Sequence, residues 1–333
     1  MTGAIAYHWR MVKKALSTQV SRAAAVPDEL SGFRLDQAAA RMFPDYSRAR
    51  LQDWIKAGNL TVNQQPARVR DKVYSADQLQ LRAEIQAVET WIAEPQALDI
   101  VHEDQDLLVI NKGMDTVVHP AAGHSSGTLL NGLLFHSPPL KLLPRAGIVH
   151  RLDKDTTGLM VVAKTVRAHT QLVRQLQRRD IGREYEAVVQ GVLTAGGTVD
   201  APLGRHPVNR KRRAVVADGQ QAITHYTVIR RFRSHTHLRV RLETGRTHQI
   251  RVHLTHLGHP IVGDKTYGGR LQIPRDCSAA LESALRAMGR QALHARRLSL
   301  VHPVSGEALA WESPLPRDMV DLLQALDTDL QQS

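Results

Sequence analysis

The chain of 333 residues is long enough for about two domains with buried cores. Its 44 Lys and Arg outnumber its 32 Asp and Glu, and the formal charge of +12 favours a polyanionic partner, nucleic acid before membrane. The single cysteine, Cys277, excludes an intramolecular disulfide framework and a cysteine-cluster zinc site, and it suits a reducing cytoplasm. No apolar run approaches the roughly 20 residues that span a bilayer, so we expect a soluble cytoplasmic protein without a membrane partner.

The first segment, residues 1–30, is basic and lacks the uninterrupted apolar centre of a signal peptide. We expect it to be a flexible extension outside the folded domains. Met11 is an alternative first residue to Met1, and the sequence leaves that choice open.

Residues 31–85 are predicted to form a compact unit. Apolar residues recur at helical spacing over residues 34–42, and Ser47 is expected to cap a second helix that ends near Gly58. Residues 60–63 predict a strand that enters a turn. Several basic side chains lie on the predicted helices, and such charged faces are usually only solvated.

The segment RLDQAAARMFPDYSRARLQDWIKAGNLTVN, residues 34–63, resembles the small RNA-binding domain shared with ribosomal protein S4. The resemblance implies that the second helix, with Arg48 and Arg50, and the turn after it lie against RNA. Gln64 stands where this domain commonly has glycine, a departure that bears on the tightness of the turn.

Residues 86–97 have linker composition, and we place the domain boundary there. From residue 98 to residue 326 strand-like runs dominate, with helices predicted near residues 128–135, after Thr165 and over residues 316–326. Many strands with few regularly spaced helices indicate an α+β domain rather than a doubly wound sheet. Residues 327–333 are expected to be a tail.

The stretch GIVHRLDKDTTGLMVVAK, residues 147–164, is the most informative part of this domain. Its two apolar runs, residues 148–149 and 159–163, predict buried strands on either side of a short charged turn. A polar loop held by rigid strands is a common place for catalytic groups, although an ordinary charged hairpin explains this stretch equally well by itself.

The segment RHPVNRKRR, residues 205–213, is strongly basic. Runs of this kind are usually solvated loops, but in a basic chain with an RNA-binding domain we favour contact with RNA phosphates, which should weaken steeply with salt. Five residues carry this charge: Arg205, Arg210, Lys211, Arg212 and Arg213.

Signatures of several other enzyme classes are missing. The phosphate-binding motifs GxGxxG and GxxxxGKS/T are absent, and so is the GxSxG nucleophile elbow of serine hydrolases. Four histidines within residues 248–259 are the most plausible metal cluster, but no cysteine or carboxylate completes a ligand set. We therefore expect neither a metal nor a cofactor.

The motifs HRLDKDTTG, REYEA and GRTHQIRVH occur in the order found in RluA-type pseudouridine synthases, a family that the chain resembles from about residue 33 to residue 325. The resemblance implies a mixed, mainly antiparallel sheet with flanking helices. It implies an enzyme that isomerises uridine in RNA by breaking the glycosidic bond, rotating the base and rejoining it through carbon. The expected substrate is 23S rRNA, in the large ribosomal subunit or its precursor, at the stem-loop that bridges the subunits, and we expect a monomer.

Three residues match the family's catalytic positions. Asp153 matches the aspartate that attacks either the uracil ring or the anomeric sugar carbon, an alternative that the sequence leaves open. A buried carboxylate tends to protonate unless a cation accompanies it, and Arg251 matches the family's salt-bridge partner of the aspartate. Tyr185 matches the tyrosine that packs against the target base, although a tyrosine on a strand is more often part of the core.

The resemblance extends to residues around this centre. Arg151 matches an arginine that fills the position vacated by the flipped base. His150, Thr156 and Thr157 are expected to hold or line the loop beside the RNA. In the third motif, Arg246 and His248 are expected to contact RNA. Gly113 stands where the family usually has proline, so we expect a looser loop there.

Two other functions remain open at this stage. A catalytically inactive RNA-binding assembly factor could share the fold, although such a relative should have lost at least one of the three catalytic residues. An unrelated hydrolase could use Asp153 and Asp155 as a carboxylate pair, but two carboxylates in one tight loop need not face the same substrate.

Overall fold

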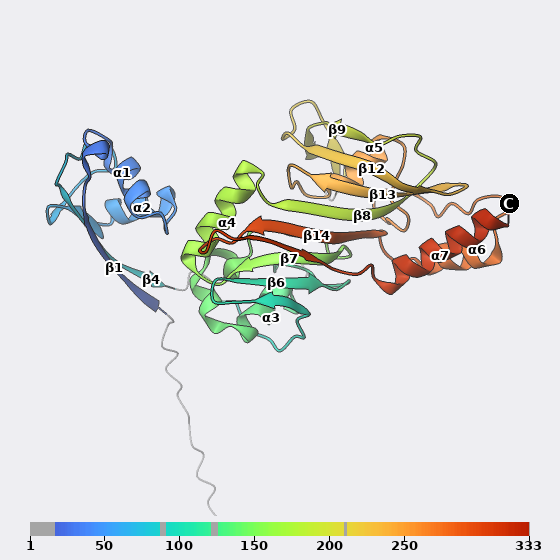
Figure 1. The fold of residues 1–333 in the computed structure, drawn as a ribbon, viewed down its shortest axis with the longest axis horizontal. Helices are drawn as coiled ribbons and strands as arrows, with labels where there is room; N and C mark the ends of the chain where they lie inside the picture. The colour runs from blue at the N-terminus through green and yellow to red at the C-terminus, as the bar shows by residue number, and fades with distance from the viewer. Residues whose placement is uncertain (1–16, 87–90, 121–125, 210–211, 333) are drawn as a thin grey trace, which may run out of the picture. The chain divides into compact units, whose positions relative to one another are not determined.

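The computed structural model describes residues 17–86, 91–120, 126–209 and 212–332 (Figure 1). The chain divides into two compact units. The first comprises Met1–Trp91 with Pro139–Pro144, and the second comprises Ile92–Pro138 with Arg145–Ser333. Among the described residues, no helix has the length and hydropathy that a membrane span requires.

The N-terminal unit contains a four-stranded sheet with the order β1-β4-β2-β3, together with two helices. Its elements are β1 (Ser17–Ala25), α1 (Leu35–Met42), α2 (Arg48–Lys56), β2 (Leu60–Val62), β3 (Gln65–Pro66) and β4 (Gln78–Gln86). The predicted cap of α2 is confirmed, because the Ser47 hydroxyl accepts a hydrogen bond from the amide of Arg50.

Strand β1 corrects the prediction that residues 1–30 form a flexible extension. Residues 17–25 pair antiparallel with β4 along their whole length, and a short 3₁₀ helix, η1 (Asp28–Leu30), follows. Within residues 19–25 only Val20 is buried, so the strand is held mainly by backbone hydrogen bonds and shows little alternation of apolar and polar residues. Residues 1–16 lie outside the described residues.

The turn between β2 and β3 is tight despite its lack of glycine. Asn63 and Gln64 have φ of 50° and 66°, and Val62 pairs directly with Gln65. A two-residue loop with both φ values positive is the type I′ hairpin turn, which matches the twist of the flanking strands. Gln64 therefore adopts a left-handed conformation at a cost of about 1–2 kcal/mol, and the departure from glycine does not loosen the turn.

The second unit is built on a nine-stranded sheet with the order β5-β6-β7-β14-β8-β13-β12-β9, and β15 pairs with β14 (Figure 1). The described pairings are antiparallel except that of β14 with β7. The strands are β5 (Ile100–Glu103), β6 (Leu107–Lys112), β7 (Thr157–Ala163), β8 (Gly182–Gln190), β9 (Gly197–Asp200), β12 (Ile223–Arg231), β13 (His235–Leu242), β14 (Leu293–Val301) and β15 (Ala308–Glu312). The mixed, mainly antiparallel α+β architecture is confirmed.

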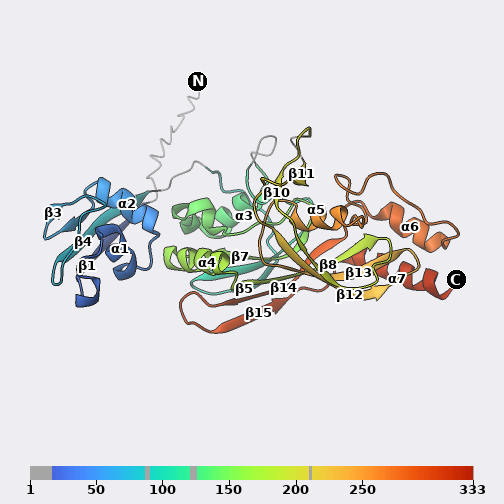
Figure 2. The same ribbon diagram turned by 90° about the horizontal axis from the view of Figure 1, so that it is seen from above.

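Helices and one small hairpin complete this unit. The α-helices are α3 (Leu129–His136), α4 (Val166–Arg178), α5 (Gln249–His256), α6 (Ala279–Ala287) and α7 (Arg317–Gln331), and 3₁₀ turns occur at η2 (Pro138–Leu142) and η3 (Pro144–Gly147). The hairpin of β10 (Leu203–Arg205) and β11 (Arg213–Val215) packs beside α5 (Figure 2). Helix α7 corrects the predicted tail, because it continues through residue 331 and buries Asp329 against Arg233.

The core beneath α4 makes β7 a rigid support. Every residue of β7 is buried, and Leu159 and Val161 pack with Leu172 of α4. Residues 148–149 do not form the predicted strand, because Ile148 makes only an isolated bridge to Val162. The seven residues between them and β7 form the central loop, residues 150–156.

The chain enters the central loop through a left-handed turn. Arg145, Ala146 and Gly147 have φ of 52°, 51° and 80°. A Cβ atom at Gly147 would lie 1.9 Å from the carbonyl oxygen of Ala163 on β7. Only glycine therefore lets the backbone pass this close to β7 on its way to the loop.

We predict that Gly147→Ala lowers the free energy of unfolding by about 3 kcal/mol or more, because it combines a steric clash with a strained φ. Gly113→Ala is the matched control: a Cβ there has no neighbour within 4 Å, and its effect should stay within about 0.5 kcal/mol. Urea unfolding of both variants measures the difference. Equal transition midpoints would contradict the close approach at Gly147.

Candidate active site

Asp153 lies in the central loop that precedes β7. Its side chain is 15% exposed, and its Oδ2 accepts a hydrogen bond of 2.9 Å from Nη1 of Arg251. Its carbonyl oxygen accepts the amide of Thr156 at 3.1 Å, which closes a turn in the loop. The structure thus brings together two residues that are 98 positions apart in the chain and that sequence analysis had paired.

Arg251 is buried in the first turn of α5 and contacts two carboxylates at once. Its Nε and Nη2 donate to the two carboxylate oxygens of Asp264 at 2.7 and 2.9 Å, which leaves Nη1 for Asp153. Burial would lower the pKa of Arg251, but the hydrogen bonds and negative charge of Asp264, followed by those of Asp153, raise it above its ordinary value. The bidentate contact fixes the plane of the guanidinium.

Asp264 is one of the residues of the candidate site that sequence analysis missed. It is 3% exposed, and besides Arg251 it binds the amides of Thr266 and Tyr267 at 2.9 and 3.0 Å. Burial would raise the pKa of Asp264, but the hydrogen bonds from Arg251 and from these amides lower it. The carboxylate is therefore ionised and holds Arg251 in place. An aspartate within GDKTYGG carries no periodic signal, so only its burial reveals this role.

Tyr185 lies on β8, opposite Val240 of β13 and Ala295 of β14, and its side chain is buried. Burial raises the pKa of Tyr185, Arg183 lowers it, and the negative charge of Asp153 raises it further. The hydroxyl is therefore protonated at neutral pH, and it lies within the electrostatic reach of Asp153.

Lys112, at the end of β6, holds the main chain of the central loop. Its Nζ donates to two carbonyls of the segment that follows β6, at 2.8 and 3.1 Å, and to the carbonyl of Lys154 at 2.8 Å. Burial lowers the pKa of Lys112 to about 8, and the nearby Asp155 and Asp153 counteract this. A lysine that donates three hydrogen bonds to backbone carbonyls ties the β6 end to the residue after Asp153.

Two residues that precede β14, Arg290 and Gln291, also hold the central loop. Nη1 of Arg290 donates to the carbonyl of Asp155 at 3.3 Å, while its Nε and Nη2 bind Asp318 of α7 at 2.6 and 2.8 Å. The amide of the Gln291 side chain donates to the Thr156 hydroxyl at 3.0 Å. Neither Lys112 nor Arg290 was predicted from the sequence, because single basic residues next to apolar runs are usually exposed.

Two predicted loop residues are bound within the protein. Nε2 of His150 accepts the amide of Val161 on β7 at 3.0 Å, and the Thr157 hydroxyl lies 2.9 Å from Nδ1 of His294. Burial lowers the pKa of His150 to about 3, and the charge of Arg183 lowers it too. These side chains hold the loop against the sheet.

The basic hairpin reaches the site through Tyr267. The amide of Arg213 donates to the Tyr267 hydroxyl at 2.8 Å, and the guanidinium carbons of Arg212 and Arg251 each lie 5.1 Å from the ring centroid of Tyr267. Arg205 is exposed on β10. Two further predicted RNA contacts lie outside the described residues: Arg210 and Lys211.

The remaining arginines that are predicted to contact RNA differ in whether their guanidinium groups have partners within the protein. Arg151 is exposed, and within the described ranges no hydrogen bond or ion pair of its guanidinium is seen. Arg246 donates through Nε to the carbonyl of Gln221 at 3.1 Å. In the N-terminal unit, Nε of Arg48 donates to the buried Asp36 at 2.9 Å, while its side chain stays 46% exposed, so its contact with RNA stays a prediction. Arg50 lies over the ring of Trp54, 5.9 Å from its centroid.

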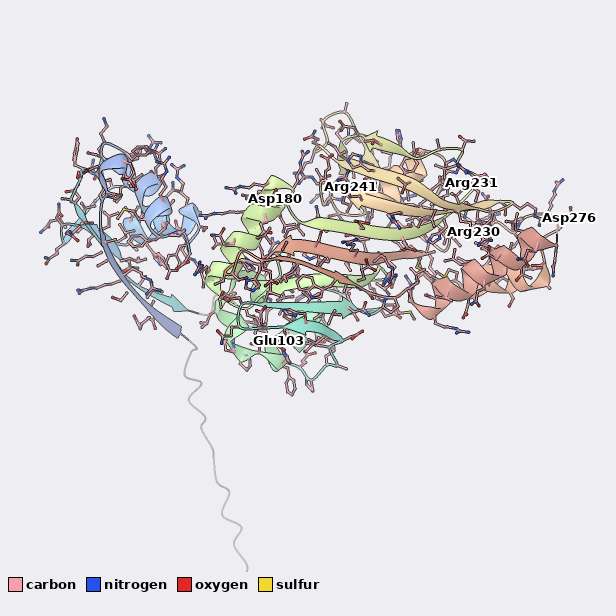
Figure 3. All side chains as sticks on the ribbon, viewed as in Figure 1. Glu103, Asp180, Arg230, Arg231, Arg241 and Asp276 are labelled. Carbon is pink, nitrogen blue, oxygen red and sulfur yellow. The ribbon has the colours of Figure 1, made fainter. Side chains whose placement is uncertain are left out.

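Other arginines on the sheet have internal partners. Figure 3 shows Arg230 and Arg231 at one end of the β12–β13 pair and Arg241 at the other. Arg230 forms an ion pair with Asp327, and Nε of Arg231 donates to the carbonyl of Leu193 at 2.8 Å. The guanidiniums of Arg230 and Arg231 are therefore bound within the protein, whereas Arg241 is exposed.

The histidines of the third motif do not converge on a metal site. His253 contacts the Thr224 hydroxyl at 2.9 Å and the carbonyl of Ala201 at 3.0 Å, and His259 contacts the carbonyl of Gln190 at 2.8 Å. Among the described residues, the potential ligand atoms that cluster within 4.8 Å belong to Asp104, Asp106 and His302. Their oxygens already accept hydrogen bonds from backbone amides and from the Thr165 hydroxyl, which explains them as part of the β5–β6 turn.

Comparisons with known proteins agree with both sequence resemblances. The sequence profile of the family described as RNA pseudouridylate synthase matches residues 106–256, and that of the S4 domain matches residues 33–79. The chain is 59% identical over 314 residues to ribosomal large subunit pseudouridine synthase D of Pseudomonas aeruginosa, which covers 94% of this chain and 98% of that protein. It is 52% identical over 318 residues to the protein of the same name from Escherichia coli K12, with 95% and 98% covered.

A solved structure supports the fold at lower identity. Human RNA pseudouridylate synthase domain containing 4 is similar with a TM-score of 0.51 and 27% sequence identity. The match covers 68% of this chain and 92% of that chain.

We predict that Asp264→Asn lowers the free energy of unfolding by about 3–5 kcal/mol, because it removes the buried partner of two guanidinium hydrogen bonds and leaves Arg251 with the partly exposed Asp153 as its counter-charge. Glu282→Gln is the matched control, since it breaks an exposed Arg–Glu pair within α6 and should change stability by well under 1 kcal/mol. Chemical unfolding compares the two variants. If Asp264→Asn lowers the free energy of unfolding as little as Glu282→Gln does, the buried Arg251 does not need the carboxylate of Asp264 for stability.

The pKa of His150 predicts a pH dependence of stability. It is about 3 in the folded chain and about 6.5 in an unfolded one, so the unfolded chain binds one more proton between these values, and stability is lost as the pH falls through this window. In His150→Gln the amide oxygen can still accept the Val161 N–H without titrating. Its loss of unfolding free energy from pH 7 to pH 4.5 should be smaller than that of the wild type by about 2 kcal/mol. Identical losses would mean that His150 is not held neutral.

Proposed function

Because this chain belongs to the RluA-type family of RNA pseudouridine synthases, we propose that it isomerises uridines to pseudouridine in large-subunit ribosomal RNA. The observation that carries the proposal is the chain of contacts from Asp153 through Arg251 to Asp264, which places a fixed cation beside a carboxylate in a largely enclosed loop. Tyr185 is buried on β8, and the negative charge of Asp153 contributes to its raised pKa, so the three residues expected of an active member are present in one unit.

Asp153 is the nucleophile of this mechanism. Arg251 holds its Oδ2 at 2.9 Å, so the other oxygen, Oδ1, is free to attack the substrate. Attack takes place either at the uracil ring or at the anomeric sugar carbon. The bond from N1 of the base to the sugar breaks, the base rotates, and carbon five joins the sugar instead. The proton leaves carbon five and one is taken up at N1, so the product is an isomer of the substrate.

Tyr185 packs against the target base in this scheme. Its raised pKa keeps the hydroxyl protonated at neutral pH, so it can donate a hydrogen bond to the base or pass on a proton in concert with the loss of the proton from carbon five. A protonated phenol at this position does not compete with Asp153 as a second anion.

Base flipping explains the exposed Arg151 beside Asp153. A uridine in folded RNA must leave its stack to reach a buried carboxylate, at a cost of a few kcal/mol. A planar guanidinium that has no hydrogen-bond or ion-pair partner among the described residues can stack and form hydrogen bonds in the space that the base has left. Arg151 lies two residues before Asp153, so residues of one loop both replace the flipped base and attack the substrate.

The rRNA is bound through its phosphates by two basic regions. The hairpin of β10 and β11 contributes Arg205, Arg212 and Arg213, with Arg246 nearby, and the S4 domain contributes the surface around Arg50. Contacts of this kind give affinity that falls steeply with salt. Recognition of a particular stem-loop then depends mainly on its shape and on splayed loop bases.

The target that fits best is the loop of the 23S rRNA stem-loop that bridges the subunits, in the free rRNA, the large subunit or its precursor. The named activity of the relatives from Pseudomonas aeruginosa and Escherichia coli supports the large subunit as substrate. We place the reaction in the cytoplasm and assign it to a monomer, since one chain supplies the nucleophile, its cation and the base-facing tyrosine.

We predict that Asp153→Asn lowers the rate of isomerisation at least about 10³-fold and leaves RNA affinity within a few-fold, because one amide replaces one carboxylate. Release of tritium from rRNA labelled at carbon five of its uridines measures the reaction, and filter binding measures affinity. Asp155→Asn, on the same loop, is the matched control and should keep most of its turnover. Turnover that is retained in Asp153→Asn and lost in Asp155→Asn would show that Asp155, and not Asp153, is the nucleophile.

A further inference from the structure

A chain of contacts leads from the basic hairpin to the free oxygen of Asp153. The hydroxyl of Tyr267 accepts the amide of Arg213 at 2.8 Å and lies 2.8 Å from Nδ1 of His248. On the other side of the imidazole, Nε2 of His248 lies 3.8 Å from Oδ1 of Asp153. This is the carboxylate oxygen that Arg251 does not bind, so the imidazole faces the atom to which we assign the attack.

The neighbours of His248 favour one tautomer. Burial lowers the pKa of His248 and Arg251 lowers it too, although Asp153 raises it, so the ring is neutral at neutral pH. An ionised carboxylate can only accept hydrogen bonds, and a lone pair on Nε2 would face it unfavourably. The proton therefore belongs on Nε2, and Nδ1 accepts the Tyr267 hydroxyl, whose oxygen in turn accepts the amide of Arg213.

The backbone at His248 supports a role for its side chain. His248 has φ of 59° and ψ of 19° immediately before α5, and its side chain makes no capping hydrogen bond to the helix. A left-handed residue that is not glycine is strained, and it persists only where its surroundings hold it. Here the conformation turns the ring toward Tyr267 and Asp153, three residues ahead of Arg251 on the same turn of chain.

We propose that His248 is a positioning residue for the nucleophile: it fixes the rotation of the Asp153 carboxylate through Oδ1 and links that orientation to the RNA-binding hairpin through Tyr267. Arg251 holds only one oxygen of the carboxylate, so a second donor is needed to fix its plane. The separation of 3.8 Å is slightly too long for a hydrogen bond, and catalytic contacts of this kind commonly shorten when substrate binds. RNA phosphates drawn to Arg212 and Arg213 would move the hairpin, Tyr267 and His248 together.

Two substitutions of His248 test the contributions of its two ring nitrogens separately. In His248→Gln the amide nitrogen can reach the place of Nε2 and donate to Asp153, whereas in His248→Asn the shorter amide reaches only the place of Nδ1. Asparagine suits a left-handed backbone better than glutamine does, so it should be the less disruptive change for folding. An order of activity in which glutamine exceeds asparagine therefore cannot come from backbone strain.

The proposal rests on the proposed isomerase function, and single-turnover kinetics on 23S rRNA fragments test it. At saturating protein we expect the rate to fall about 100-fold in His248→Asn, and about 10-fold or less in His248→Gln and in Tyr267→Phe. The protein concentration that gives half of the maximal rate should change by less than about threefold in all three. Asparagine as active as glutamine, or a loss of affinity with an unchanged maximal rate, would overturn the proposal.

A second measurement does not depend on catalysis. The ¹⁵N shifts of the histidine ring nitrogens in the full-length protein, with His248 assigned by its absence in His248→Asn, report the tautomer directly. We expect the proton on Nε2 in the wild type and a mixture of tautomers in Tyr267→Phe. A proton on Nδ1 in the wild type would overturn the proposal whether or not the chain is an isomerase. An inactive wild type with the expected tautomer would instead contradict the proposed function alone.

Discussion

The site depends on one buried guanidinium that is shared by two carboxylates. Arg251 gives two of its hydrogen bonds to Asp264 and one to Asp153, so its position is set mainly by Asp264. The contact with Asp153 alone would hold the guanidinium through one hydrogen bond and leave its plane unfixed. The second carboxylate fixes the guanidinium plane, and the guanidinium places a positive charge at a fixed position beside Asp153.

The fold makes this interaction possible by joining segments that are distant in the chain. The central loop precedes the buried strand β7, α5 supplies Arg251, and the turn after α5 supplies Asp264. Lys112 and Arg290 bind the backbone carbonyls of Lys154 and Asp155, the two residues that follow Asp153, so the loop is held through its main chain. Rigid support of this kind lets a carboxylate on a loop keep the geometry that attack requires.

The sequence predicted the parts of the site that lie in continuous motifs. Asp153, Tyr185 and Arg251 could be identified because each occurs within a long characteristic segment, and the caps of the helices could be identified from Ser47 and Thr165. Asp264, Lys112 and Arg290 could not, because their roles arise from burial and long-range pairing rather than from local pattern.

The errors in the predicted fold have the same physical origin. Strand β1 was missed because pairing with β4, rather than side-chain burial, defines it. Residues 148–149 were wrongly predicted to form a strand because a short apolar run can be buried without joining a sheet.

Mapping of pseudouridine by carbodiimide treatment and reverse transcription tests the central claim most directly. The 23S rRNA would come from cells that lack this protein, complemented with the wild type or with Asp153→Asn. The account predicts that a cluster of reverse-transcription stops in the bridging stem-loop is lost without the protein and is restored only by the wild type. Stops that are unchanged in the absence of the protein, or restored equally by both forms, would contradict an isomerase that acts through Asp153.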